Sequence, residues 1–306
     1  MIKIGTDCSG IEAPIEALEI ICKNNDLKYK HEFSSEIDEY AKSYIKANHS
    51  PNILFPDMTK RDPMDVPYVD IYVSGFPCQP FSRANKYKTS VDPRLNLFEN
   101  CISVIKHGKP KFFILENVKT LVTLNKGSYF QEILKRLNDL DLYNVNWKVM
   151  NTKDYGIPQS RDRLYIIGVL KKYSKKEYEF PKEKPMKKLS EFIDKNNTAK
   201  NEIKESNKEL FKNIPDNSIF IDTGFRGANF PNSGLWSPCI CAQPLLWCVP
   251  MKRKASVKEY LMLQGFPTDV NISLSDHRMK ILIGNSMTVD VIQGLMESGL
   301  RSLGIL

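Results

Sequence analysis

The stretch Ile2-Lys3-Ile4-Gly5-Thr6-Asp7-Cys8-Ser9-Gly10-Ile11-Glu12-Ala13 runs from an apolar strand through a turn of small residues into a helix. A turn of this kind lets a ligand approach the main chain and the helix N-terminus in a doubly wound α/β sheet. The glycine pattern of dinucleotide-binding turns is absent, and so is the Gly-Lys-Ser/Thr of a phosphate-binding loop. The stretch therefore favours a cofactor without phosphate groups.

Strands and helices alternate over the first half of the chain. Short clusters of β-branched and aromatic residues predict strands at 2–6, 31–36, 69–74 and 111–116, with helices at 13–23, 38–47, 95–106 and 129–140. Two further strands, at 145–151 and 164–170, enclose turn-forming residues and suit a late hairpin. This order predicts an α/β fold with a doubly wound, mainly parallel sheet and helices on both faces.

Size and charge limit the function. A chain of 306 residues exceeds what one core usually holds, which favours a catalytic domain with a smaller second domain. Its 44 Lys and Arg against 36 Asp and Glu give a net charge of +8, which favours a polyanionic partner. No apolar run approaches the roughly 20 residues that cross a bilayer, and the first residues resemble a buried strand, not a signal peptide. We therefore expect an intracellular protein with no membrane partner.

The seven cysteines are odd in number and scattered, which does not resemble a disulfide framework, so reduced thiols are expected. There is no Cys-x-x-Cys pair, and the four histidines are dispersed, so neither a zinc site nor a serine-histidine hydrolase is assembled. Cys239, Cys241 and Cys248 have a spacing that could hold a metal. Alternating buried strand positions explain them more simply, and no metal is expected.

The amino-acid composition of the chain changes after residue 170. Lysines crowd residues 171–188, and polar stretches continue to about residue 250, which indicates a small domain or a long insertion; a solvated linker is the alternative for 171–188. Ser256-Val257-Lys258-Glu259 then forms a capping box that begins a helix, and helices at 276–283 and 287–299 follow. We predict a catalytic and cofactor-binding domain at 1–170, a second domain at 171–250, and C-terminal helices at 251–306, the last returning to the catalytic domain.

Chemically capable side chains follow three of the predicted strands. Glu36 ends the second strand, Cys78 lies on a loop stiffened by Pro77 and Pro80 after residues 69–74, and Glu116 ends the strand at 111–116. The carboxyl ends of parallel strands meet at the edge where α/β sheets bind ligands. A thiolate is an effective nucleophile, a carboxyl group can move a proton, and an acid after the second strand suits ribose hydroxyls.

Five motifs occur in one order along nearly the whole chain: Pro77-Cys78-Gln79-Pro80-Phe81-Ser82, Glu116-Asn117-Val118, Gln159-Ser160-Arg161-Asp162-Arg163, Leu263-Gln264-Gly265-Phe266-Pro267 and Gly284-Asn285-Ser286. Together they resemble the motifs of the cytosine-5 DNA methyltransferases of phage and restriction-modification systems. The resemblance implies the S-adenosylmethionine-dependent methyltransferase fold, S-adenosylmethionine as cofactor, double-stranded DNA as partner, and target recognition by residues 171–250. The first motif departs from the family pattern, since Cys8 stands at the aromatic position and Glu12 and Ala13 replace a glycine pair.

The resemblance also implies a mechanism. Cys78 adds to carbon 6 of a cytosine flipped out of the duplex, Glu116 contacts N3 and the amino group, and a methyl group moves to carbon 5. Arg163 and Arg161 match the family's catalytic arginines. The positions expected to bind the cofactor are Cys8, Ser9, Gly10, Ile11, Glu36, Ile37, Asp57, Met58, Pro77, Asn285 and Ser286. Those expected to contact DNA are Gln79, Ser82, Arg83, Arg94, Gln159, Arg226, Cys239 and Ile240.

Two alternatives remain open. One is the same chemistry on tRNA, although the long variable segment and the Pro-Cys-Gln-Pro-Phe-Ser string favour DNA. The other is a non-catalytic DNA-binding relative, against which the presence of both Cys78 and Glu116 argues. We expect a monomer in the cytoplasm of a bacterium or phage-infected cell, or in the nucleus if the source is eukaryotic.

Overall fold

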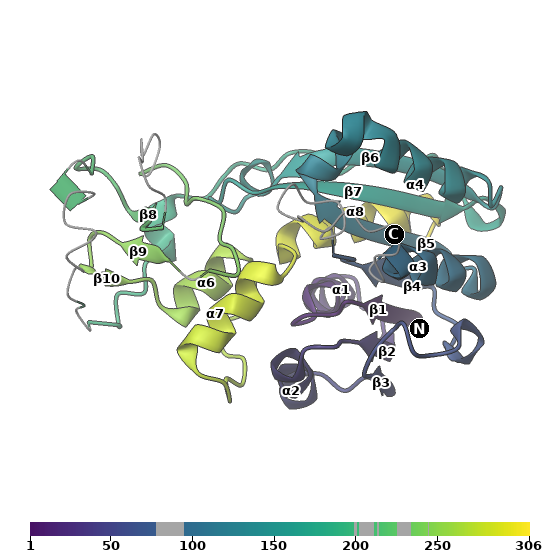
Figure 1. Ribbon diagram of the computed structural model, residues 1–306, viewed down its shortest axis with the longest axis horizontal. Helices are drawn as coiled ribbons and strands as arrows, with labels where there is room; N and C mark the ends of the chain where they lie inside the picture. The colour runs from purple at the N-terminus through teal and green to yellow at the C-terminus, as the bar shows by residue number, and fades with distance from the viewer. Residues whose placement is uncertain (78–94, 199–200, 202–210, 213, 225–233, 244) are drawn as a thin grey trace. The chain divides into compact units, whose positions relative to one another are not determined.

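The computed structural model describes residues 1–77, 95–198, 201, 211–212, 214–224, 234–243 and 245–306 (Figure 1). The chain forms two compact units, one of residues 1–150, 162–181 and 291–306 and the other of residues 151–161 and 182–290. Six residues predicted to act in catalysis or DNA binding lie outside the described residues, namely Cys78, Gln79, Ser82, Arg83, Arg94 and Arg226.

A seven-stranded sheet forms the centre of the first unit. Its strands in spatial order are β3 (Ile53–Phe55), β2 (Tyr29–Ser35), β1 (Ile2–Asp7), β4 (Ile71–Ser74), β5 (Phe112–Val118), β7 (Asp162–Leu170) and β6 (Tyr143–Asn151). The pairs from β3 to β5 are parallel, whereas β7 is antiparallel to β5. The predicted mainly parallel sheet is therefore confirmed, and β6 and β7 are neighbours as expected.

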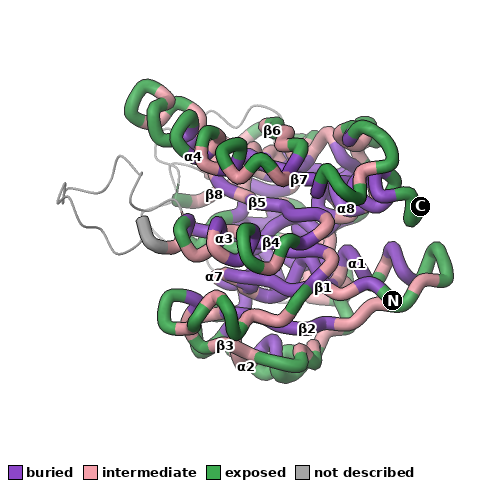
Figure 2. Tube along the Cα trace, turned by 90° about the vertical axis from the view of Figure 1, so that its right-hand side faces the viewer, coloured by how far each residue is buried: buried purple, intermediate pink, exposed green. Residues whose placement is uncertain are grey.

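Helices cover both faces of this sheet (Figure 2). The helices of the first unit are α1 (Ala13–Asn24), α2 (Glu39–Asn48), α3 (Leu95–Gly108), α4 (Ser128–Asn138) and α8 (Val289–Ser302). Each lies within a few residues of its predicted range. Single 3-10 turns occur in the chain at Pro63–Asp65, Lys119–Val122, Leu124–Gly127, Thr152–Asp154, Lys171–Tyr173 and Leu189–Phe192.

The core lies on the two faces of the central strands. Residues of β5 alternate, so Phe113 and Leu115 join the apolar cluster under α3 and α4, while Phe112 turns to the other face. On that face the ring of Phe112 packs against Gly299 of α8. A Cβ at position 299 would be only 2.6 Å from the ring, so only glycine permits this approach. Tyr178 stacks on the same ring, which places residues of the predicted Lys-rich segment in the first unit.

The second unit contains a three-stranded antiparallel sheet of β8 (Phe220–Asp222), β9 (Leu246–Cys248) and β10 (Arg253–Lys254), with α6 (Val257–Leu263) and α7 (Asp276–Asn285). The capping box at Ser256 and Glu259 is confirmed. The carboxylate of Glu259 also accepts two 2.8 Å hydrogen bonds from the guanidinium of Arg253, and both side chains are buried. The start of α6 is thus fixed by a bidentate ion pair that the sequence did not predict.

The cysteines of the second unit do not occupy alternating strand positions, contrary to expectation. Cys248 is buried in β9, but Cys239 and Cys241 lie outside the strands, and Cys241 is exposed. Within the described part of the chain, no group of three or more potential metal-binding side chains was found. No helix in that part is long and apolar enough to cross a membrane.

Candidate active site

The turn after β1 has an unusual backbone. Cys8, Gly10 and Glu12 have φ angles of +51°, +56° and +62°, in the left-handed region that residues with a Cβ rarely adopt. A Cβ built on Gly10 would meet no atom of the described residues within 4 Å, so these residues leave the main chain open to a ligand at that point. Ser9 holds the turn against β2, because its hydroxyl oxygen accepts from the N–H of Ser35 at 3.0 Å.

Glu36, at the end of β2, closes the same turn from the other side. Its Oε2 accepts a 2.7 Å hydrogen bond from the N–H of Gly10, and its Oε1 accepts from the N–H groups of Ile37 and Asp38 at 2.9 and 3.0 Å. The apolar side chain of Ile37 is 71% exposed, although burial is the usual state for isoleucine. An open main chain, a fixed carboxylate and an exposed apolar side chain fit the sugar and aromatic ring of the expected S-adenosylmethionine.

Asp57 and Met58 differ in exposure. The Asp57 carboxylate accepts from the N–H and hydroxyl groups of Thr59 at 2.9 and 2.7 Å. Burial alone would raise the pKa of Asp57, but these bonds and the charge of Lys60 lower it, so the group is ionised. Met58 is buried and lies 3.7 Å, sulfur to sulfur, from Cys8. Ile11 is fully buried as well, so the side chains of Met58 and Ile11 are enclosed by the protein, unlike that of Ile37.

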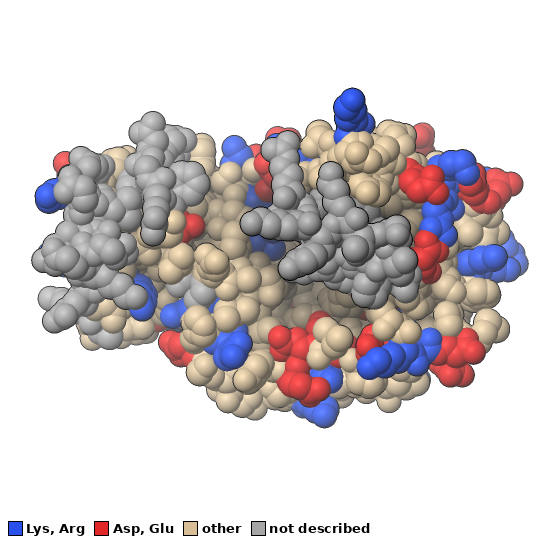
Figure 3. Space-filling model, viewed as in Figure 1, with Lys and Arg blue, Asp and Glu red and all other residues tan. Residues whose placement is uncertain are grey.

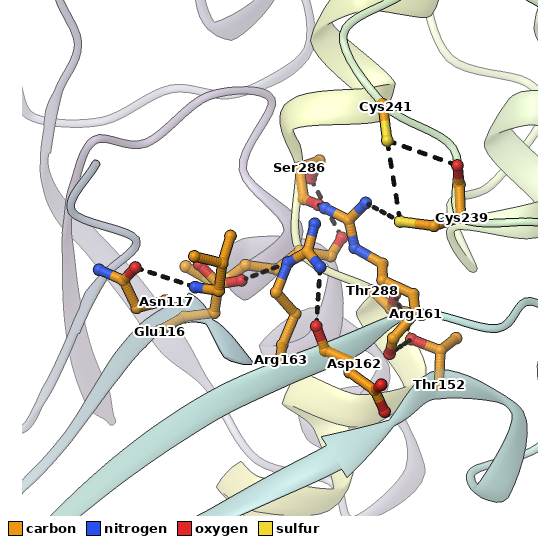
Figure 4. Close-up of polar contacts among 12 residues, drawn as sticks. Glu116, Asn117, Thr152, Arg161, Asp162, Arg163, Cys239, Cys241, Ser286 and Thr288 are labelled. Carbon is orange, nitrogen blue, oxygen red and sulfur yellow. Dashed lines mark hydrogen bonds and ion pairs between the residues drawn. The ribbon is translucent and has the colours of Figure 1, made fainter. Parts of the chain in front are cut away.

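Glu116 and Arg163 form an ion pair at the junction of β5 and β7, with Nε and Oε1 separated by 3.1 Å (Figure 4). The antiparallel register explains the contact, because Val118 is paired with Arg163 and Glu116 with Tyr165. Side chains of paired and next-but-one residues point to one face. Both charged groups are largely buried, with 13% and 16% of the side chains exposed. The predicted proton-transfer residue and one predicted arginine are therefore in direct contact.

Asn117 connects this pair to the segment that precedes Cys78. Its side-chain amide donates a 2.9 Å hydrogen bond to the carbonyl oxygen of Phe76, and its Oδ1 accepts from the N–H of Val118 at 2.9 Å. Asn117 is buried, and the Phe76 ring packs against Phe98 with centroids 5.6 Å apart. The end of β5 thus fixes the main chain two residues before the predicted nucleophile.

Arg161 has a different environment from Arg163. It is buried in the second unit, where its guanidinium donates to the carbonyl oxygens of Ile240, Gly284 and Ser286 at 2.7, 3.2 and 2.7 Å (Figure 4). One of its nitrogens also lies 3.5 Å from the sulfur of Cys239. These contacts connect the segment of Arg161 to the main chain at Ile240 and at residues 284–286, so the role of Arg161 is structural.

Gln159 and Gln264 complete this buried group in the second unit. The amide nitrogen of Gln159 donates to the carbonyl of Leu263 at 2.7 Å and to Oε1 of Gln264 at 3.0 Å, and its own Oε1 accepts from the N–H of Ile240. Gln264 donates in turn to the carbonyls of Ile283 and Ser286. Gln159 and Ile240 are both buried, which does not fit their predicted contacts with DNA. Their hydrogen bonds instead connect segments of the chain that are distant in sequence.

The other predicted residues of the second unit lie at the end of α7. Asn285 is exposed, whereas Ser286 is buried and is used through its carbonyl oxygen. Pro77, in the first unit, is partly exposed at the last described position before Cys78.

Sequence reasoning missed two buried groups beneath the turn. Asp7 accepts hydrogen bonds from Arg61 at 2.5 Å and from the hydroxyl of Tyr72 at 2.7 Å. Glu12 is fully buried and accepts from Thr6 at 2.8 Å. For Glu12 a signal existed in the sequence, namely a charged residue at a position where the family resemblance implies glycine.

Charge is mixed on the face of the molecule that Figure 3 shows, where Lys and Arg side chains are interspersed with Asp and Glu among the described residues. The described Lys and Arg side chains on that face therefore do not form one basic patch.

The seven-stranded sheet has the fold of the S-adenosylmethionine-dependent methyltransferases, and comparison with known proteins identifies the family. The family model of the C-5 cytosine-specific DNA methylases matches residues 8–224 of the sequence. The chain therefore belongs to this enzyme family. It is 36% identical to the type II methyltransferase M.HaeII of Haemophilus aegyptius, over 90% of this chain and 87% of that protein. It is 34% identical to M.NgoBI of Neisseria gonorrhoeae, over 85% and 83% of the two chains. The crystal structure of the Dnmt2 methyltransferase of S. pombe shares the fold, with a TM-score of 0.69, 19% identity, and coverage of 98% and 99%.

Proposed function

We propose that this chain methylates carbon 5 of cytosine in double-stranded DNA through a covalent bond between Cys78 and carbon 6 of a flipped-out base. The observation that carries the proposal is the joined Glu116-Asn117-Val118 motif, which pairs with Arg163 and fixes the main chain at Phe76. Carbon 5 of cytosine is a weak nucleophile, so the ring must be activated before it accepts a methyl group. Addition of a thiolate to carbon 6 supplies that activation.

Glu116 acts at the opposite side of the cytosine ring. A carboxyl group that hydrogen-bonds or protonates N3 stabilises the negative charge that thiolate addition creates. Arg163 holds the Glu116 side chain at 3.1 Å and supplies a positive charge next to it. After methylation the proton at carbon 5 leaves to a base, and Cys78 is expelled as the ring regains its aromatic character. We assign this chemistry to Cys78, Glu116 and Arg163, and a structural role to Arg161.

S-adenosylmethionine supplies the methyl group. The residues that fit it are Gly10, Glu36, Ile37 and Asp57 in the first unit. Glu36 would hold the ribose hydroxyls and Ile37 would lie against the adenine ring, which accounts for an exposed isoleucine beside a fixed carboxylate.

We assign DNA recognition to the second unit, which contains most of the variable segment at 171–250. Side chains that recognise a DNA sequence contact the base edges in the grooves, while lysine and arginine side chains bind phosphates. A protein with this activity would work as a monomer in the cytoplasm, beside the DNA that it modifies.

The test is methylation in cells. DNA from cells that express the wild type, Cys78→Ser or Cys241→Ser is sequenced after bisulfite treatment, the last variant being a control that removes an exposed thiol of the second unit. We expect protected cytosines in one sequence context with the wild type and Cys241→Ser, and none with Cys78→Ser. Transfer of labelled methyl groups to tRNA but not to duplex DNA would replace this proposal with the RNA alternative.

A covalent trap tests the mechanism directly. A duplex that carries 5-fluorocytosine at the methylated site cannot lose the group at carbon 5, so the adduct with Cys78 should persist and be located by mass spectrometry. Methylation without any adduct at Cys78 would refute the assigned nucleophile.

A further inference from the structure

The carboxyl group of Glu12 lies directly beneath the turn that is proposed to bind the cofactor. The residue has a φ of +62°, is fully buried, and begins α1 through its main-chain carbonyl, which accepts from the N–H groups of Ile15 and Glu16. Its side chain does not cap the helix. A side chain in this strained conformation is retained only where the surroundings hold it firmly.

Hydrogen bonds to one oxygen of Glu12 join three elements. Its Oε1 accepts from the hydroxyl of Thr6 in β1 at 2.8 Å and from the hydroxyl of Ser34 in β2 at 2.5 Å. The Thr6 hydroxyl is also 2.8 Å from that of Ser9, which is itself within the turn. Glu12 therefore fixes the turn from below, while Glu36 fixes it at Gly10 from the side.

The charged groups near Glu12 do not compensate a negative charge. The closest is His31, with Nε2 at 3.6 Å, but burial lowers the pKa of His31 to about 4, so it is neutral. Behind it, His49 has a pKa lowered to about 4 by burial and contacts Glu16, and Glu36 adds a second negative charge. Burial raises the pKa of Glu12 to about 8, against the opposing effect of its hydrogen bonds. At neutral pH Glu12 is an uncharged acid.

We propose that Glu12, in its uncharged form, is a positioning residue that sets the affinity of the turn at residues 8–11 for S-adenosylmethionine. This inference rests on the proposed function. An ionised carboxylate cannot remain in this buried site without water or a cation. Ionisation would therefore favour the entry of water beside the carboxylate, between β1 and β2, and would loosen the packing beneath the turn.

The experiment measures equilibrium binding of S-adenosylhomocysteine to the full chain by calorimetry between pH 6.5 and pH 9.5. The variants are Glu12→Gln, which stays uncharged, and Glu12→Ala, which loses both hydrogen bonds. The matched control is Glu19→Gln, which removes an exposed charge from the same helix. Circular dichroism verifies that each variant is folded.

We expect the Kd of the wild type to rise about tenfold as the pH passes about 8, the equivalent of one lost hydrogen bond, and the control to follow it. Glu12→Gln cannot ionise at position 12 but keeps every other titrating group. If ionisation of Glu12 causes the rise, the Kd of this variant should stay nearly constant over the pH range in which the wild-type Kd rises. Glu12→Ala should bind about tenfold more weakly already at pH 7.

A Glu12→Gln curve that coincides with the wild type, or a Glu12→Ala variant that is folded and binds normally, would overturn the inference while leaving the proposed function intact. A folded wild type that binds no S-adenosylhomocysteine at any pH would overturn both.

Discussion

Replacing Arg161 by methionine should destabilise the second unit, although Arg161 and Arg163 belong to the same sequence motif. The Arg161 guanidinium donates to the carbonyl oxygens of Ile240, Gly284 and Ser286, at 2.7, 3.2 and 2.7 Å, and only 2% of the residue is exposed. Methionine matches the length of the aliphatic part but donates no hydrogen bond. The three carbonyls therefore lose a charged donor in a place that water does not reach.

The size of the loss follows from the acceptors. A buried polar group left without its partner costs about 1–3 kcal/mol. Ser286 keeps the amide of Gln264 as a donor at 3.0 Å, and Ile240 keeps only the weak thiol donor of Cys239 at 3.6 Å, so the cost applies in full to Gly284 and in large part to Ile240. Methionine no longer requires burial of a positive charge, which offsets part of the loss. We expect the free energy of unfolding to fall by about 2–5 kcal/mol, which for a typical urea dependence displaces the midpoint by about 1–2 M.

The assay is urea unfolding followed by circular dichroism and tryptophan fluorescence, with Arg163→Met as the matched control. Arg163 forms a largely buried ion pair with Glu116, so Arg163→Met removes one polar contact and should lower stability by about 1–3 kcal/mol, while it reduces turnover strongly. A variant Arg161→Met with wild-type stability and lost turnover would refute the structural role and return Arg161 to the catalytic groups.

Three further changes have defined outcomes. Asn117→Leu removes the hydrogen bond to the carbonyl of Phe76, so kcat should fall by about tenfold or more while the Kd for S-adenosylhomocysteine stays constant; a change confined to Kd would contradict this. Glu259→Gln leaves the charge of Arg253 buried and unpaired, and urea unfolding should show a loss of about 3–5 kcal/mol, with an unchanged midpoint as the contrary result. Glu12→Gln should alter the pH dependence of stability: the folded-state pKa of about 8 lies above the usual 4.5, so wild-type stability from this group is lost as the pH rises from about 4.5 to about 8. The variant lacks this loss and should be more stable than the wild type at pH 8 by up to a few kcal/mol, but not at pH 4.5; an equal difference at both pH values would show that Glu12 does not titrate.

The sequence by itself determined the order of strands and helices and the mainly parallel sheet. Local patterns were sufficient, since each predicted strand is a short apolar cluster and each helix an amphipathic segment with recognisable ends. Strand β3 was not predicted, because three residues at Ile53–Phe55 carry too little pattern to distinguish a strand from a loop. The capping box at Ser256 was predicted because its partners are three residues apart, whereas the ion pair from Glu259 to Arg253 crosses a turn and was not.

The tertiary structure decided what each motif does. Arg161 and Arg163 are two residues apart in sequence, but one is buried against main-chain carbonyls and the other pairs with Glu116. Likewise, Gln159 has a side chain as polar as any DNA-contacting residue, yet its hydrogen bonds are satisfied inside the second unit. Residue type fixes which bonds a side chain can make, while burial and the positions of distant partners fix which bonds it does make. Those positions are properties of the folded chain, and short-range sequence patterns do not contain them.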